Sequence, residues 1–407
     1  MRIAIVGGGI GGLAAALFLR QAGLDATVYE QAPALREVGA GLVVPPNVVR
    51  PLARLGLAKR LPEFAVRLEA AWEFRRWQDG RVLFVQPMGD ECERLYGAPC
   101  YVAHRADLLA LLQGALPPAQ LRLAHRCYAV EQRDGHYRDG EVQLAFVRDD
   151  GSTDWVSADG AVGADGIHSA VAPAVFAAAA EADPGAAMPT APRFSGLCAF
   201  RFLVPAAEAP AMALRPVQTL WLGPGRHLVH YPISGGRLVN VVAIVPAGHW
   251  RTESWTAEGR AEDVAAEFRG WHDDVQRLIA AAREVKRWAM YDRDPLPRWT
   301  SGRVTLLGDA AHAMLPFFAQ GAAQAIEDAE VLAQCLRGAD VATMPAAMAR
   351  YEALRRPRAS EVQLMSRGRE YRNHLPDGPE QERRDAEFAS GDPLKQSAWL
   401  YGHEPPL

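Results

Sequence analysis

Three acidic residues of this chain stand where short apolar runs meet glycine-containing turns. They are Glu30, Asp165 and Asp309. A carboxylate at the end of a strand can accept hydrogen bonds from sugar hydroxyls, and a following helix can stabilise phosphate with its free backbone N–H groups. The residue types and their positions therefore point to nucleotide binding. Taken alone, the turn at Asp309 is equally well explained as a packing unit with an incidental aspartate.

The N-terminal acid belongs to a strand–turn–helix–strand unit. Residues 2–6 and 25–29 are predicted strands, and residues 13–22 are a predicted helix. Glycines between the first strand and the helix fit G-x-G-x-x-G: Gly7 for the tight turn, Gly9 for close approach of a pyrophosphate, and Gly12 for packing of the helix. Glu30 follows at the spacing of an acid that binds a ribose hydroxyl pair. The unit predicts an adenine dinucleotide site, without choosing between NAD and FAD.

The third acid precedes a second predicted helix. Residues 304–307 have the length and composition of a buried strand, and apolar residues between 325 and 336 are spaced for one buried helix face. The free N–H groups of this helix lie around Gly321 and Ala322, where they can stabilise negative charge.

Composition describes an ordinary globular protein. The chain has 407 residues with 49% hydrophobic and 23% charged residues, which allows about two to three domains. A net charge of −4 gives no reason to expect nucleic acid or an anionic membrane as a partner. The five cysteines show no CxxC spacing, which favours a reducing, cytoplasmic setting without a metal site. Glycines interrupt the uncharged stretch 3–19, which argues against a signal peptide.

The middle of the chain reads mainly as β-sheet. A hairpin is predicted from residues 142–147 and 154–162, several strands between 194 and 245, and one helix over 261–282. Within this sheet, His227 and Tyr231 share one face of a strand. The alternative for His227 is an ordinary buried strand histidine.

Three motifs in order, GGGIGG with Glu30, GADGIHS and LLGDAAH, resemble the single-component FAD-dependent aromatic hydroxylases, the family of para-hydroxybenzoate hydroxylase. The stretches YGAPCYVAHRADL and MYDRDPLPRW resemble those of 3-hydroxybenzoate 6-hydroxylase, salicylate hydroxylase and 6-hydroxynicotinate 3-monooxygenase. The resemblance implies an α/β fold: a Rossmann-like FAD-binding domain, an inserted β-sheet substrate domain and C-terminal helices. We expect the FAD-binding domain in residues 1–70, 100–175 and 291–345, the substrate domain in 71–99 and 190–290, and the helical region in 346–407.

The resemblance also implies cofactors and partners. FAD would be the bound cofactor, NADH or NADPH the co-substrate, and a flavin C4a-hydroperoxide the oxygen donor to a small phenolic or hydroxylated heteroaromatic acid. The partners would be this substrate and O2, with the protein a monomer or homodimer. The cofactor-binding residues expected are Gly7, Gly9, Gly11, Gly12, Glu30, Gln31, Arg105, Asp165, Gly166, Asp309, Gly321 and Ala322.

The same resemblance assigns the substrate site. His227 would act as the base that deprotonates a ring hydroxyl, with Tyr231 beside it. The pocket lining expected from the sequence is Val43, Phe202, Trp221, Pro316, Phe317 and Phe318.

Two alternatives stay open. A flavin enzyme of this kind can instead hydroxylate or epoxidise a larger natural product. A protein of this fold can also bind a dinucleotide without catalysis, although the presence of Arg105, Asp165 and Asp309 together argues against that reading.

Overall fold

A mainly parallel sheet is built from strands in residues 2–163 and 300–306. The computed structural model describes residues 1–35, 40–132, 142–182, 191–254, 257–388, 390 and 392–405. Neighbouring strands are parallel except for the β18–β19 pair at one edge. The strand order is β18 (Thr300–Ser301), β19 (Val304–Leu306), β12 (Gly160–Gly163), β1 (Arg2–Val6), β2 (Asp25–Tyr29) and β8 (Leu121–Arg122). Because parallel strands end at the same edge, this order brings Glu30, Asp165 and Asp309 to one side of the sheet.

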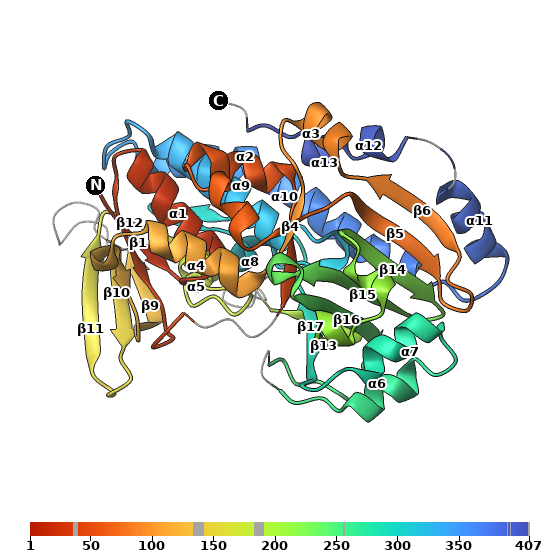
Figure 1. The fold of residues 1–407 in the computed structure, drawn as a ribbon. Helices are drawn as coiled ribbons and strands as arrows, with labels where there is room; N and C mark the ends of the chain where they lie inside the picture. The colour runs from red at the N-terminus through yellow and green to blue at the C-terminus, as the bar shows by residue number, and fades with distance from the viewer. Residues whose placement is uncertain are drawn as a thin grey trace.

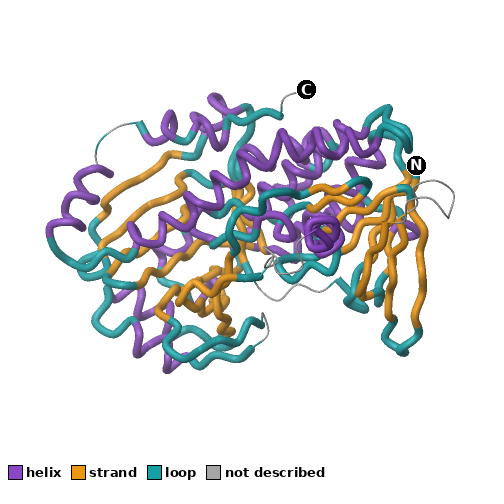
Figure 2. The backbone as a smooth tube through the Cα atoms, turned by 180° about the vertical axis from the view of Figure 1, so that it is seen from behind, coloured by secondary structure: helices purple, strands orange, loops and turns teal. Residues whose placement is uncertain are grey.

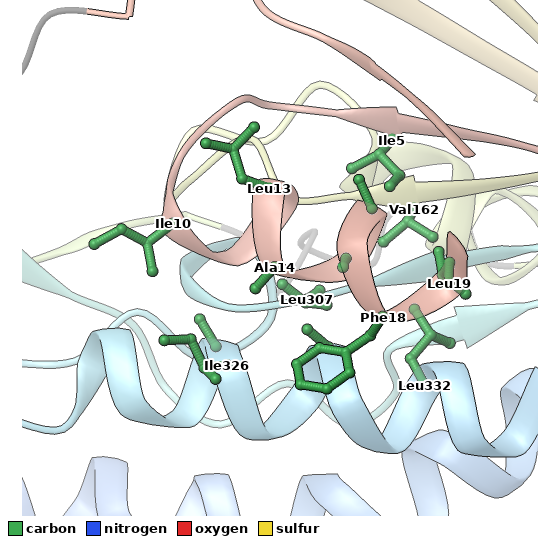
Figure 3. Close-up of a cluster of buried hydrophobic side chains, with 14 of the residues drawn as sticks. Ile5, Ile10, Leu13, Ala14, Phe18, Leu19, Val162, Leu307, Ile326 and Leu332 are labelled. Carbon is green, nitrogen blue, oxygen red and sulfur yellow. The ribbon is translucent and has the colours of Figure 1, made fainter. Parts of the chain in front are cut away.

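Two helices fill the space beside this sheet. Helix α1 (Ile10–Gln21) packs along α9 (Gly321–Leu336), and Figure 3 shows Phe18 of α1 lying against the helix that carries Ile326. The buried residues of α1 include Gly12, Ala14, Ala15 and Ala16, whose small side chains let the helices approach closely. A Cβ on Gly11 would lie 2.8 Å from Leu307 and 3.1 Å from Ala325, which shows how little room the contact leaves.

A seven-stranded sheet forms the other half of the molecule (Figure 1). Helices α6 (Ala261–Glu267) and α7 (Asp273–Ala280) cover one of its faces. All of its strand pairs are antiparallel except β14–β5. Its order is β17 (Lys286–Asp292), β13 (Arg193–Pro205), β16 (Leu238–Pro246), β15 (Arg226–Ile233), β14 (Val217–Gly223), β5 (Ala70–Arg76) and β6 (Val82–Pro87).

Two smaller sheets complete the strands. One pairs β11 (Thr153–Ala158), β10 (Val142–Val147) and β9 (Arg126–Gln132), and the other pairs β3 (Gly41–Val44), β7 (Tyr101–His104) and β4 (Val66–Arg67).

Two predicted elements are wrong in detail. The predicted hairpin strand 154–162 is two strands, because Gly160 begins β12, which leaves the hairpin and pairs with β1. The predicted helix 261–282 is broken into α6 and α7 by a turn at Gly270, whose φ of 79° is unfavourable for residues with a side chain. In both cases the apolar pattern continues on either side of the break, so the sequence pattern alone did not reveal the break.

A long helix, α10 (Met344–Asn373), joins the two halves. Figure 2 shows it running diagonally from the parallel sheet to the seven-stranded sheet. Within the described residues, no helix is long and apolar enough to cross a membrane. The other helices are α2 (Pro46–Arg54), α3 (Asp90–Tyr96), α4 (Arg105–Ala115), α5 (Ala172–Ala182), α8 (Asp309–His312), α11 (Pro379–Phe388), α12 (Pro393–Gln396) and α13 (Ala398–Tyr401), and a 3-10 turn, η6, spans Pro316–Phe318.

Candidate active site

The glycine turn after β1 leaves an open approach to backbone N–H groups. Gly7 has a φ of 106°, and a Cβ on Gly12 would lie 1.9 Å from the carbonyl oxygen of Gly7, so both positions require glycine. A Cβ on Gly9, by contrast, would meet nothing within 4 Å. Gly9 is the N-cap of α1, and its surroundings therefore offer both room and free N–H groups to a phosphate.

Glu30 lies beside this turn. Its Oε2 accepts a hydrogen bond from the Gly8 N–H at 2.6 Å, and its Oε1 accepts one from the Ala32 N–H at 2.8 Å. The carboxylate is thus held next to the phosphate position by two backbone donors, where a ribose would follow a pyrophosphate. Gln31 is exposed beside it. Gly11 differs from Gly9, because a Cβ on Gly11 would lie against Leu307 and Ala325.

The second acidic loop is shaped by its own aspartate. Asp165 Oδ2 accepts the Ala170 N–H at 2.7 Å and the Val171 N–H at 3.4 Å, while Gly166 turns the chain with a φ of 79°. Burial raises the pKa of Asp165. Its Oδ1 is buried and makes no hydrogen bond within the described residues. One carboxylate oxygen therefore builds the loop and the other is left for a ligand.

The third acid begins the short helix α8, which was not predicted, and it lies near the start of α9, where the sequence predicted a helix to begin. Asp309 is exposed, and a Cβ on Gly321 would lie 4.0 Å from its Oδ1. Gly321 and Ala322 are the first residues of α9, so a carboxylate and free N–H groups face the same space. Arg105 begins α4 directly after β7, and its N–H donates to the Ala40 carbonyl at 2.8 Å.

Arg293 is a residue that the sequence reasoning missed. It is fully buried, and its guanidinium donates to the carbonyl of Ala310 at 2.9 Å and to the carbonyl of Ile167. It therefore ties the loop after Asp165 to α8, the short helix that begins at Asp309. Its only signal was its place in the stretch MYDRDPLPRW.

His227 faces the interior side of the seven-stranded sheet. It is 2% exposed, its Nδ1 lies 2.6 Å from Nε2 of His374, and its ring contacts Phe317 edge-on at 5.4 Å. Burial lowers the pKa of His227 well below its usual range and that of His374 to about 4, so both imidazoles are neutral at pH 7. His374 belongs to the C-terminal end of α10 and gave no sequence signal.

Tyr231 shares this face, as predicted from strand alternation. It pairs with Asn240, and β3 approaches so closely that a Cβ on Gly41 would lie 2.6 Å from the Tyr231 ring. Burial raises the pKa of Tyr231, so its hydroxyl stays protonated and can donate. Val43 and Phe318 pack in the same apolar cluster as Tyr231.

Two predicted pocket residues are on the wrong side of the sheet. Phe202 and Trp221 pack with Leu228 against α6 and α7, and Trp221 stacks on His272 at 5.1 Å. They are large, apolar and buried, which was the basis for choosing them, but strand register turns them away from His227. Of the loop residues, Phe317 and Phe318 lie on the His227 side, and Pro316 is exposed at the start of η6.

A surface hollow elsewhere does not involve these groups. It is lined by Trp250, Glu267 and Arg287 among others. Arg287 stacks on Phe200 in the cluster that α6 and α7 cover, on the face opposite to His227.

Comparisons with known proteins agree with this arrangement. Residues 1–366 match the family described as FAD binding domain. The chain is 45% identical to a 3-amino-4-hydroxybenzoate 2-monooxygenase of Streptomyces platensis, across 99% of this chain and 96% of the relative. It is 39% identical to a 6-hydroxynicotinate 3-monooxygenase of Pseudomonas fluorescens, across 90% of each. The structure of a salicylate hydroxylase substrate complex superposes with a TM-score of 0.80 at 28% identity, covering 99% of this chain and 96% of the other.

The site itself fits a flavin dinucleotide. The open N-cap at Gly9, the unpaired buried oxygen of Asp165, and the exposed Asp309 beside the start of α9 lie at one edge of the parallel sheet. They provide N–H donors for phosphates and a carboxylate for hydroxyls, as an extended nucleotide requires. With its fold, its motifs and its relatives in agreement, this chain belongs to the family of FAD-dependent aromatic hydroxylases.

Proposed function

We propose that this enzyme hydroxylates a small aromatic acid that carries a ring hydroxyl, with 3-amino-4-hydroxybenzoate as the first candidate. The observation that carries the proposal is the neutral, buried His227 on the sheet face shared with Tyr231. The candidate comes from the relative of Streptomyces platensis, whose 45% identity extends over 403 residues.

FAD would be held at the edge of the parallel sheet. We assign the pyrophosphate to the turn at Gly9, the ribose to Glu30, and the flavin end to Asp309 and the start of α9. When bound, FAD supplies electron transfer from NADH or NADPH and the activation of O2. We also propose the domain division stated above, since β5 and β6 pair with the sheet of residues 193–292.

His227 would remove the proton of the ring hydroxyl. Its Nδ1 contacts His374, and its Nε2 makes no hydrogen bond within the described residues. A proton on Nδ1, donated to Nε2 of His374, leaves Nε2 of His227 as an acceptor. Deprotonation of a phenol increases the electron density of the ring, which favours attack by an electrophilic oxygen.

Two further residues support this step. His374 is less buried than His227, and as the acceptor of the Nδ1 proton of His227 it would act as a positioning residue. The protonated hydroxyl of Tyr231 would donate a hydrogen bond to the phenolate oxygen and stabilise its charge.

The test is anaerobic reduction of the holoenzyme by NADH and NADPH in the presence of single aromatic acids. The panel contains 3-amino-4-hydroxybenzoate, 6-hydroxynicotinate, 3-hydroxybenzoate, salicylate and one larger phenol. We expect one small acid to accelerate flavin reduction and, in air, to yield a product that carries one additional ring hydroxyl. Reduction that no small acid accelerates, with oxygen consumed only to hydrogen peroxide, would refute the proposal.

A further inference from the structure

One arginine of α10 has an unusual environment. The guanidinium of Arg369 lies 4.9 Å from the ring centre of Phe318, 5.6 Å from that of Phe74 and 5.7 Å from that of Trp72. Its Nε is buried without a hydrogen-bond partner, and Arg369 forms no ion pair within the described residues. A partly buried cation is therefore surrounded by aromatic rings, and no described residue supplies it with a counter-charge.

Other arginines of the same helix show the contrast. Apart from the exposed Arg350, each of them has a carboxylate within ion-pair distance: Arg355, Arg356, Arg358, Arg367 and Arg372. Most of these partner carboxylates belong to other segments of the chain that pack against the helix. Arg369 is partly buried and has no such partner within the described residues, and an unpaired charge away from water is costly unless something else compensates it.

Arg369 stays charged despite this burial. Desolvation lowers its pKa to about 10, which leaves the guanidinium protonated at neutral pH. The surrounding rings compensate only partly, because a cation–π contact is weaker than a desolvated ion pair. An anion that enters from outside would complete the environment.

Strand register places Arg369 on the same side of the sheet as His227. Phe74 pairs with Leu220, and Leu220 pairs with Val229, so these side chains share a face. Val229 lies between His227 and Tyr231 on that face. Phe318, which stacks on Arg369, adjoins Phe317, which contacts His227.

We propose that Arg369 binds the carboxylate of the aromatic substrate, through charge-assisted hydrogen bonds from its guanidinium. The ring would lie against Phe318 with its hydroxyl directed at His227. This inference rests on the proposed function and adds to it the group that selects acids over neutral phenols. A planar guanidinium suits a carboxylate because two parallel N–H donors match its two oxygens.

The test compares an acid with its neutral amide. The holoenzyme is titrated with 3-amino-4-hydroxybenzoate and with 3-amino-4-hydroxybenzamide, and Kd is read from the change in flavin absorbance. We expect Arg369→Met to raise the Kd of the acid by about 10- to 100-fold and to leave that of the amide within about twofold. Arg369→Lys, which keeps the charge but loses the fork, should fall between wild type and Arg369→Met.

Two controls separate the possible failures. Arg356→Met removes a paired, partly exposed arginine from the same helix and should leave both Kd values unchanged. Equal weakening of acid and amide by Arg369→Met, or unaltered acid binding, overturns the assignment of Arg369 while turnover of the acid by wild type still upholds the proposed function. If Arg369→Met does not fold, the Lys variant decides: an unchanged ratio of acid to amide affinity refutes the assignment. Wild type that binds acid and amide equally also refutes it.

Discussion

Two arginines near the two ends of helix α10, Arg355 and Arg369, have opposite electrostatic surroundings. Near its start, Arg355 contacts Glu327 at 2.7 Å and Asp328 at 2.8 Å, and Asp328 in turn accepts from His312 at 2.6 Å. Near its end, the guanidinium of Arg369 lies against aromatic rings without an ion pair within the described residues, and His374 contacts another imidazole. Arg367 and Arg372 at this end are ion-paired, so the unbalanced charge there is that of the partly buried Arg369.

This difference distinguishes a charge network that stabilises the fold from charged and polar groups that remain available to a ligand. Asp328 also accepts the Gly308 N–H at 3.0 Å, so the balanced network fixes the turn that presents Asp309. The charges of this network are paired with one another, although Nδ1 of His312 makes no hydrogen bond within the described residues. The unbalanced end, with Arg369 and the free Nε2 of His227, leaves donors and acceptors that a substrate can satisfy.

The largest effect is expected at the open end. His227→Gln should lower the rate of hydroxylation by about 10²- to 10⁴-fold, because the substrate loses its base. FAD content and reduction by NAD(P)H should persist, so oxygen would go to hydrogen peroxide. Product formed per NAD(P)H consumed measures this. The matched control is His230→Gln on the opposite face of β15, which should keep the wild-type ratio. Loss of FAD from the His227 variant would show that its position was misjudged.

The pH dependence follows from the same residues. Their pKa values are lowered by burial, to about 4 for His374, so neither histidine should produce an activity change between about pH 6 and 8. Because the unfolded state binds protons with the higher pKa, near 6.5, these histidines reduce stability progressively as pH falls below that value. A midpoint of hydroxylation near pH 6.5 that His227→Gln abolishes would contradict this.

At the closed end, the expected effect is on stability. Arg355→Met should destabilise the holoenzyme by about 3–5 kcal/mol, because Glu327 and Asp328 would remain buried without their partner. Denaturant unfolding followed by circular dichroism measures it. Arg356→Met, which breaks a partly exposed pair, should stay within about 0.5 kcal/mol of wild type. Similar midpoints for both variants would remove the distinction between the two ends.

The smallest effect is expected for a substitution in the proposed FAD site. Asp309→Asn should weaken FAD binding by about tenfold, the loss of one hydrogen bond to a charged group. Titration of the apoprotein with FAD, followed by flavin fluorescence, gives the Kd. The control variant Asp90→Asn replaces an exposed carboxylate of α3, outside the proposed FAD site, and should bind FAD as wild type does. An Asp309 variant with unaltered Kd would place that carboxylate outside the site.

Sequence patterns predicted the parallel-sheet half well because its signals are local. The glycine turn, Glu30 and the start of α9 each follow a strand within a few residues, and parallel strands bring such ends together. The same reasoning placed His227 and Tyr231 on one face, since alternation along a strand is also local. It failed for Phe202 and Trp221, because alternation identifies two buried faces without showing which of them meets the cofactor half.

By itself, the sequence determined the family, the cofactor and the edge of the sheet where the acids gather. Tertiary structure alone decided which side chains complete the substrate side. His374 reaches His227 across 147 residues, and Arg369 reaches the rings of β5 and η6 only because α10 crosses from one half to the other. The course of that helix depends on the packing of both sheets, and a periodic pattern records that a face is buried but not what lies against it.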